Sequence, residues 1–329
     1  MIGRLPRRVA CALLLLAPAA VADEPRPKSP PDRKGDEIIV CGQFVHTGAP
    51  VVTWIDPGGY DAYDTKLRFP AEAAKDAPAE LKLGFGDRNT AGLDPALRKK
   101  VSEKDWDLST LQQQVDQFVI HYDVCGTSKQ CFKVLHDGRG LAVQFMLDLD
   151  GTIYQTLDLK EGAWHATKAN GRSVGVEIAN MGATTRDETS GHFAKWYKKE
   201  GGETVITIPG GVEKSGLRDK SAVLKPIRPD LISGPIHGEV RQQYDLTPQQ
   251  YDSLIKLTAT LHRTFPKINL DYPRGSDGKV LLTALSKEDY EKYHGVLGHW
   301  HVQLNKQDPG PAFQWDKVIE GAKAVPTTP

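Results

Sequence analysis

The sequence has no excess of charge of either sign, because its 42 lysine and arginine residues are matched by 42 aspartate and glutamate residues. Basic residues are not gathered into a stripe either. Such a chain has neither an overall field nor a local basic surface to attract nucleic acid or an anionic membrane. We therefore expect no nucleic-acid partner, and we expect any substrate to be captured through contacts in a groove.

Long hydrophobic runs are also scarce, and the one clear run lies between about Val9 and Val21. It is shorter than the roughly 20 apolar residues that a membrane-spanning helix needs, so we do not interpret it as an anchor. Arginines precede it, and a small-x-small site, Ala-Val-Ala, comes just before Asp23. This layout is typical of a secretory signal peptide over residues 1–22. We expect export to the periplasm or the extracellular space, with no stable membrane insertion after signal removal.

Cysteine is rare, with four in 329 residues, and Cys11 would be lost with the signal peptide. Cys125 and Cys131 close a short loop, "CGTSKQC", that contains glycine and serine. In an oxidising compartment these two residues could form a disulfide, which is the pairing that we predict. Two free thiols, or one thiol that binds a metal, are the alternatives. Cys41 is left without a partner.

The chain is long enough for one large domain or two small ones, and its 39% hydrophobic and 26% charged residues are ordinary for a globular protein. The stretch "DEPRPKSPPDRKGD" is rich in proline and charge and predicts a disordered linker. Polar, glycine-rich residues later in the chain indicate an insertion. We predict a signal peptide at 1–22, a linker at 23–36, an N-terminal extension at 37–105 packed on the main domain, a main domain at 106–322 with an insertion at about 181–240, and a disordered tail at 323–329.

From residue 108 onward the pattern indicates both helices and strands. "LSTLQQQVDQ" predicts a short helix, whereas "FVIHYD" and "RSVGVEIAN" predict buried strands. A hairpin is expected where two β-rich runs are joined through Asp150-Gly151. Thr247 as N-cap and Pro248 at the first helical position predict a longer helix. These elements together predict an α/β fold with a central mixed β-sheet flanked by helices.

Three residues that can bind a metal stand at predicted strand ends and in a stiff turn. His121 comes near the end of "FVIHYD", His299 follows the apolar "VLG", and Asp308 precedes "PGP". Taken singly, each is more often a structural residue. Taken together, two imidazoles and one carboxylate form a usual ligand set for catalytic zinc, which leaves a fourth position open for water. We therefore predict a zinc site at strand ends.

Two further residues have the properties that hydrolysis at such a site requires. Glu177 lies among apolar residues in "VGVEIAN", where a buried carboxylate without a role or partner would be costly. It is a candidate general base. Lys306, two residues before Asp308, is a candidate for stabilising a developing oxyanion.

The ordered motifs "VIHYD", "DLDGTIYQ", "AWHA", "SVGVEIAN" and "GH…KQDPGPAF" resemble those of the type 2 N-acetylmuramoyl-L-alanine amidases, a family whose fold is shared with peptidoglycan recognition proteins. The resemblance covers roughly residues 110–320. It implies zinc binding by the histidine of the first strand, the histidine of "GH" and the aspartate of "DPGPAF". In this sequence these are His121, His299 and Asp308.

The resemblance also implies roles for other residues. The family's glutamate and its lysine before the aspartate correspond to Glu177 and Lys306. "AWHA" brings Trp164 and His165, which border the substrate groove in relatives. The "CGTSKQC" spacing is similar to that of a disulfide that follows the first zinc histidine in recognition proteins.

The sequence departs from the family pattern in one spacing, because the distance from "GH" to the aspartate is about one residue shorter than in cytoplasmic members. His301 therefore competes with His299 as a ligand. We favour His299, because of the preceding glycine and its position after the strand. We expect His301 to lie behind the ligands or in the groove. The insertion and the N-terminal extension have no counterpart in minimal members and could reshape the groove.

The activity that the resemblance implies is zinc-dependent hydrolysis of the amide between N-acetylmuramic acid and L-alanine, in peptidoglycan or muropeptides. One alternative is a domain that binds muropeptides without cutting them. Another is a zinc hydrolase that acts on a different amide because the insertion closes off large glycans. Loss of the third ligand or of the glutamate would mark a binding domain, and both Asp308 and Glu177 are present.

Overall fold

The computed structural model describes residues 33–72, 78, 80–185 and 191–326. The predicted signal peptide and residues 23–32 of the predicted linker lie outside this part of the chain. Within the described residues, no helix is long and apolar enough to cross a membrane.

A mixed six-stranded sheet forms the centre of the molecule, which confirms the predicted fold class. The β6–β7 pair is antiparallel, as the predicted hairpin requires, and every other neighbouring pair is parallel. A sheet of this kind is covered on both faces, which explains why its strands are buried almost throughout. In spatial order the strands are β14 (Gly295–Gly298), β5 (Gln117–Tyr122), β9 (Ser173–Ile178), β6 (Phe145–Leu147), β7 (Ile153–Gln155) and β3 (Val51–Thr53).

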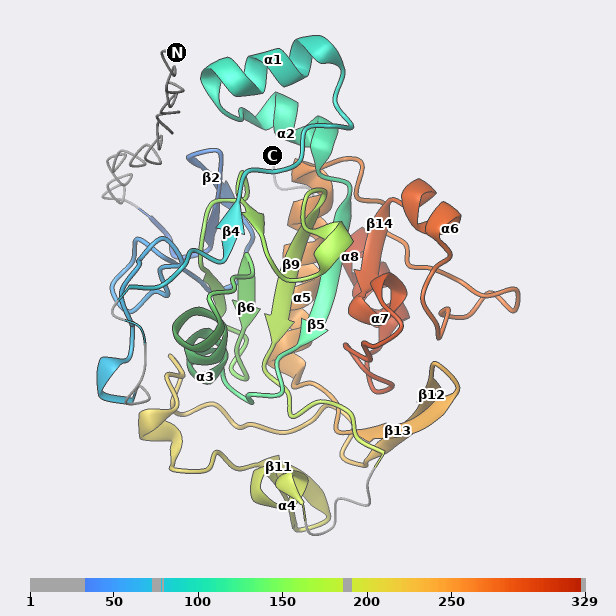
Figure 1. Ribbon diagram of the computed structural model, residues 1–329. Helices are drawn as coiled ribbons and strands as arrows, with labels where there is room; N and C mark the ends of the chain where they lie inside the picture. Colours follow the sequence, from blue (N-terminus) through green and yellow to red (C-terminus); the bar gives the residue numbers. More distant parts are fainter. Residues whose placement is uncertain (1–32, 73–77, 79, 186–190, 327–329) are drawn as a thin grey trace, which may run out of the picture.

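Helices cover both faces of this sheet. The helices α5 (Pro248–Thr264) and α8 (Trp315–Ala324) lie behind the sheet in Figure 1, whereas α3 (Ser128–Phe132) lies in front of it. As predicted, Thr247 caps α5. Its hydroxyl accepts a hydrogen bond from the backbone N–H of Gln250, and the side chain of Gln250 accepts one from the backbone of Thr247.

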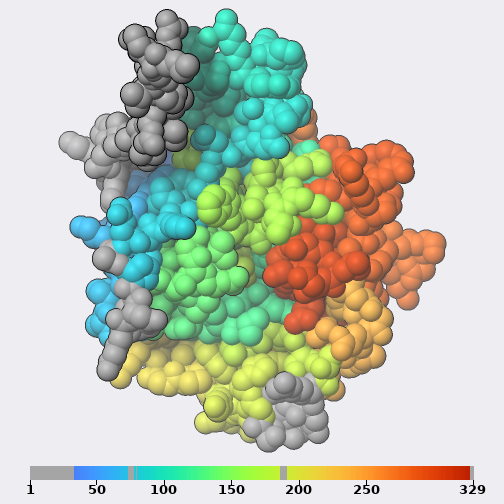
Figure 2. All heavy atoms as spheres, viewed as in Figure 1, coloured from blue at the N-terminus to red at the C-terminus, as the bar shows by residue number. Residues whose placement is uncertain are grey.

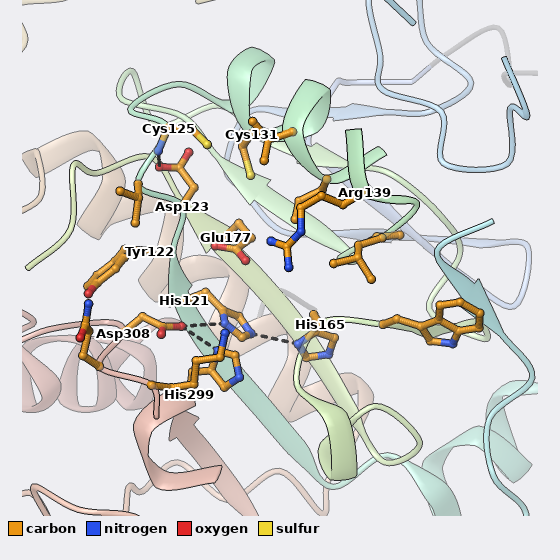
Figure 3. Close-up of a pocket in the computed structure, with 18 of the residues that line it drawn as sticks. His121, Tyr122, Asp123, Cys125, Cys131, Arg139, His165, Glu177, His299 and Asp308 are labelled. Atoms are coloured by element: carbon orange, nitrogen blue, oxygen red, sulfur yellow. Dashed lines mark hydrogen bonds and ion pairs between the residues drawn. The ribbon is translucent and has the colours of Figure 1, made fainter. Parts of the chain in front are cut away.

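The alternation of side chains along β5 and β9 separates the core from the opposite face of the sheet. Phe118 and Ile120 of β5 and Val176 of β9 share the main hydrophobic core with α5. Successive strand residues point to opposite faces of a sheet. His121 and Glu177 therefore lie on the face away from α5, and Figure 3 shows them side by side there.

The N-terminal extension is not only packed on the main domain but is built into its sheet, because β3 pairs with β7 at the edge. The hairpin that precedes β3 is held by Gln155 of β7. The amide of Gln155 donates to the carbonyl of Ile39 at 2.8 Å and accepts from its N–H at 2.7 Å. A side chain of the central sheet thus fixes the extension in place.

The described residues include parts of the predicted linker and of the predicted tail. Residues 33–36 belong to the folded part, because the guanidinium of Arg33 pairs with the carboxylates of Glu37 and Asp56. At the other end α8 continues to Ala324, so the first two residues of the predicted tail are helical.

The predicted insertion region carries two hairpins in the described residues, β10–β11 and β12–β13. The β12–β13 hairpin borders the loop that carries Lys306: His237, in its turn, donates a hydrogen bond from Nε2 to the carbonyl of Lys306 at 2.8 Å. The remaining helices and strands of the described residues are β1 (Glu37–Val40), β2 (Gln43–His46), η1 (Pro70–Glu72), β4 (Phe85–Gly86), α1 (Pro95–Lys104), α2 (Leu108–Gln114), η2 (Lys133–Asp137), β8 (Gly162–Ala163), η3 (Thr167–Ala169), α4 (His192–Trp196), β10 (Tyr197–Glu200), β11 (Glu203–Ile206), η4 (Val212–Lys214), β12 (Ile232–Ile236), β13 (Glu239–Gln243), α6 (Lys287–Lys292) and α7 (His299–Val302).

Candidate metal centre and active site

Three predicted ligands meet at the carboxyl ends of two neighbouring strands. His121 lies near the end of β5, and His299 begins α7 directly after the parallel neighbour β14. The Nδ1 atoms of His121 and His299 are 2.8 Å and 3.0 Å from Oδ2 of Asp308 (Figure 3). All three residues are buried, and their potential ligand atoms lie within 4.8 Å of one another. The structure thus brings together the predicted set from positions 187 residues apart in the chain.

The hydrogen bond of the second ring nitrogen of His299 shows which of its two nitrogens carries the lone pair. Nε2 is 2.8 Å from Oε1 of Gln303, an oxygen that can only accept, so a neutral His299 keeps its proton on Nε2. The lone pair of Nδ1 then faces the carboxylate of Asp308 without a proton between them. A cation bound by both groups removes the repulsion between two such acceptors, and a hydrogen-bonded outer nitrogen is the usual state of a metal-binding histidine.

The protonation states of the cluster also suit a metal ion. Burial lowers the pKa of His121 to about 4, and the neighbouring His299 adds to this, against the opposing effect of Asp308. Burial disfavours ionisation of Asp308, but the two imidazoles outweigh it and hold the pKa of this carboxyl below its usual range. Zinc ligands must be deprotonated in this way. The residues present therefore fit a zinc ion.

Gln303 provides a test of this arrangement. A Gln303→Leu change removes the acceptor that orients His299, and we expect metal affinity to fall by about 10- to 100-fold. Competition with a chelator of known affinity measures this change. Gln113→Leu, on the exposed side of α2, is the control and should leave the affinity unaltered. An unchanged affinity in the Gln303 variant would contradict the proposed orientation.

Glu177 lies beside the cluster because β9 pairs with β5, and its Cα is the register partner of His121. Its Oε2 atom is buried and has no hydrogen-bond partner among the described residues. Burial raises the pKa of Glu177 well above its usual value, and the charge of Asp308 raises it further. A carboxyl in this state holds a proton more readily than an ordinary glutamate, as a group that takes a proton from water must.

Lys306 shares a cavity of about 320 Å³ with the cluster and with Glu177. Its backbone is fixed from two sides, by the carbonyl of Gln303 and by the ring of His237. In Figure 2 the red surface around α7 meets the green surface of α3 and the yellow-green surface around β8 near the centre of the visible face. All five predicted metal-binding and catalytic residues thus line one cavity.

Trp164 and His165 have different environments although they are adjacent. The side chain of Trp164 stands at the cavity and the residue is 45% exposed, as expected for the rim of a groove. The ring of His165 also lines the cavity but points at His121: its Nδ1 is 2.9 Å from Nε2 of His121, and its Nε2 is 3.2 Å from Oγ of Ser173. His165 therefore contacts a candidate ligand, in addition to bordering the groove.

Two cavity residues were missed from the sequence. Asp123 accepts backbone hydrogen bonds from Cys125 and Gly126, and burial raises its pKa to about 7. Its place directly after the strand in "VIHYD" could have indicated it. Arg139 follows η2 and points into the cavity beside Glu177 (Figure 3), and no carboxylate of the described residues forms an ion pair with it. No sequence signal marked Arg139, because its segment has no motif.

The expectation for His301 is wrong. Its Nε2 donates a hydrogen bond to the carbonyl of Leu281 at 2.7 Å, and its Nδ1 accepts one from the N–H of Gly298 at 2.9 Å. Both nitrogens are thus occupied away from the cluster, and the buried ring packs between Trp300 and Trp315. His301 is a structural residue of the α7 region.

The predicted disulfide is not formed, and Cys125, Cys131 and Cys41 are free thiols. The side-chain hydrogen bond between Cys131 and Cys125, together with burial, raises the pKa of the Cys131 thiol. Cys41 lies at a tight turn between β1 and β2 with a positive φ of 48°. Burial raises its pKa to about 12. In the fold Cys41 is a turn residue, and its backbone N–H donates a hydrogen bond to the carboxylate of Asp158.

These features define an α/β protein with a buried two-histidine, one-aspartate candidate metal centre at the base of a cleft. The chain belongs to the N-acetylmuramoyl-L-alanine amidase family, because the family model matches residues 111–311, more than half of the chain. A comparison with curated proteins found no match.

Several solved amidase structures are similar to the chain at low identity. AmiD from E. coli, solved with anhydro-N-acetylmuramic acid-L-Ala-D-gamma-Glu-L-Lys, is 16% identical over 63% of this chain, with a TM-score of 0.34. The match spans 57% of the AmiD chain. The endolysin LysCS from Clostridium intestinale is 16% identical over 65% of this chain and 88% of its own, with a TM-score of 0.34. An AmpD derivative is 13% identical over 76% of this chain and 96% of its own, with a TM-score of 0.33.

Proposed function

We propose that the protein is a zinc-dependent N-acetylmuramoyl-L-alanine amidase, which hydrolyses the amide between N-acetylmuramic acid and L-alanine in peptidoglycan or muropeptides. The observation that carries this proposal is the unpartnered carboxylate oxygen of Glu177, which shares its cavity with His121, His299 and Asp308. A domain that only binds muropeptides gains nothing from such a buried carboxyl, which is costly to keep. Membership of the amidase family supports the same activity.

The residues of the cavity divide the chemistry between them. Zinc held by His121, His299 and Asp308 would supply Lewis acidity, which polarises a carbonyl and lowers the pKa of water. Glu177 would take the proton of the attacking water and return it to the leaving amine of L-alanine. The ammonium group of Lys306 would stabilise the negative charge that develops on the carbonyl oxygen.

Mass spectrometry of purified muropeptides after incubation with the zinc-loaded protein tests this function. We expect free peptides that begin with L-alanine and glycans without stems. Intact muropeptides that remain bound to the protein would instead indicate a binding domain. Cleavage of soluble fragments but not of intact sacculi would show that the insertion restricts the substrate.

We also propose that the protein acts after export, as the signal-peptide pattern at residues 1–22 indicates. Expression of the full chain in a bacterium with both membranes should give a mature protein outside the cytoplasm. N-terminal sequencing should start at Asp23. A cytoplasmic protein that keeps its first residues would contradict this proposal.

A further inference from the structure

A second cavity of about 760 Å³ lies next to the first, and its size is within the usual range for ligand sites. Three segments line it: residues 58–72 of the N-terminal extension, the start of α3, and residues 196–216 of the insertion. These blue, green and yellow segments adjoin at the lower left of Figure 1. Cys125 lines both cavities, so the second one adjoins the cavity of the metal centre at this residue.

The charges of this second cavity do not cancel locally. Glu72 lines the cavity, and its two carboxylate oxygens are already paired with the ammonium groups of Lys129 and Lys133, each at 3.1 Å. The other carboxylate of the cavity, on Glu213, pairs with a lysine outside the cavity. Arg68 and Lys214 line the cavity as well, and no carboxylate of the described residues forms an ion pair with either.

One wall of the second cavity is formed by the ring of Trp196, which packs over Gly126. A Cβ atom on Gly126 would lie 2.4 Å from the ring of Trp196, so only glycine lets this ring close over the loop after β5. Phe69 adds a second ring, which Lys129 contacts at 5.2 Å from the ring centre. The cavity therefore combines apolar surfaces with two unpaired cations.

The first cavity has two ends that differ in character. Figure 3 shows Cys125 and His165 on opposite sides of Glu177. The His165 end carries the exposed ring of Trp164, which suits the flat apolar face of a sugar. The Cys125 end adjoins the cationic cavity, which suits a peptide that ends in a carboxylate.

We propose that the second cavity is a subsite for the distal part of the substrate's stem peptide, in which Arg68 and Lys214 bind its terminal carboxylate. This inference rests on the proposed amidase function, since that function places the scissile amide at the metal centre. The subsite is built from the extension and the insertion, and it makes the protein select substrates with long stems.

Calorimetric titration with free stem peptides tests the subsite without relying on catalysis. The probes are the dipeptide L-Ala-γ-D-Glu and the pentapeptide L-Ala-γ-D-Glu-L-Lys-D-Ala-D-Ala. We expect the Arg68→Ala/Lys214→Ala protein to bind the pentapeptide at least about fivefold more weakly, the factor that about 1 kcal/mol of ion pairing gives. Its affinity for the dipeptide should match that of the wild type. The control, Lys66→Ala/Lys198→Ala, removes the same charge from exposed positions outside the cavity and should bind both peptides normally.

Equal losses for the two peptides, or no loss for the pentapeptide, would overturn the subsite. Kinetics on muropeptides with two- and five-residue stems then separate the two proposals. If the wild type cleaves both equally well and the double variant does too, the subsite is wrong and the amidase function stands. If no muropeptide is cleaved but pentapeptide binding depends on Arg68 and Lys214, the amidase function is wrong and the peptide site remains.

Discussion

A Glu177→Gln protein is expected to bind zinc normally and to lose about 10²- to 10⁴-fold in kcat, the range that a positioned acid or base contributes. Glutamine has nearly the same shape as glutamate but cannot take a proton from water. The Oε2 atom of Glu177 has no hydrogen-bond partner among the described residues. Replacing Glu177 with glutamine therefore breaks no hydrogen bond at this atom. Steady-state kinetics on a defined muropeptide, together with metal analysis of the purified variant, measure both effects.

Glu161→Gln is the matched control for this experiment. Burial raises the pKa of Glu161 to about 7, and its carboxylate accepts a hydrogen bond from Tyr63 at 3.2 Å, but it does not line the metal cavity. Its exchange should leave kcat within about threefold of the wild type, since the amide oxygen of glutamine can still accept the Tyr63 hydrogen bond and the change lies outside the site. A Glu177→Gln protein that keeps zinc and near-full activity would exclude Glu177 as the base.

An Asp308→Ala protein is expected to lose both its metal and its activity. The change removes the only carboxylate of the described residues that both imidazoles contact, and leaves His121 and His299 as a two-ligand site. We expect zinc affinity to fall by more than the roughly 100-fold that loss of an outer hydrogen-bond partner can cause. Metal content after dialysis, and activity after zinc is added back, measure the effect.

Asp36→Asn provides the control, because Asp36, Glu37 and His46 form another group of possible ligands among the described residues. Glu37 of that group already pairs with Arg33 and accepts backbone hydrogen bonds, so we expect no change in zinc content. Loss of zinc in Asp36→Asn but not in Asp308→Ala would place the metal in the N-terminal extension and reject the assignment made here.

The residues of the candidate site that lie in motifs, at the ends of strands or in a turn, were predictable from the sequence. His121 and Glu177 follow from strands that are apolar except at these positions, and Asp308 from a stiff turn. Side chains that lie beside the site without a motif were not predictable in this way. Arg139 reaches the cavity only because α3, which runs directly into η2, packs against β6 and β9, and no local pattern shows this.

The wrong expectations have a common physical origin. The disulfide was inferred from the spacing of Cys125 and Cys131, but spacing does not determine how two thiols are oriented. His301 was placed near the ligands because the distance from "GH" to the aspartate is about one residue shorter than in cytoplasmic family members. In α7 the side chains of His299 and His301 point in different directions, and His301 meets the carbonyl of Leu281 in place of the cluster.

The sequence by itself determined the α/β class, the order of strands and helices, and the three residue types that could bind a metal, because alternation, capping and motif order are local properties of the chain. Only the tertiary structure decided that β3 of the extension joins the sheet, which nitrogen of each histidine faces Asp308, and which cavity adjoins the metal centre. These features depend on contacts between segments far apart in the sequence. His165 and the strands that carry the ligands fix them through packing and hydrogen bonds that no single segment contains.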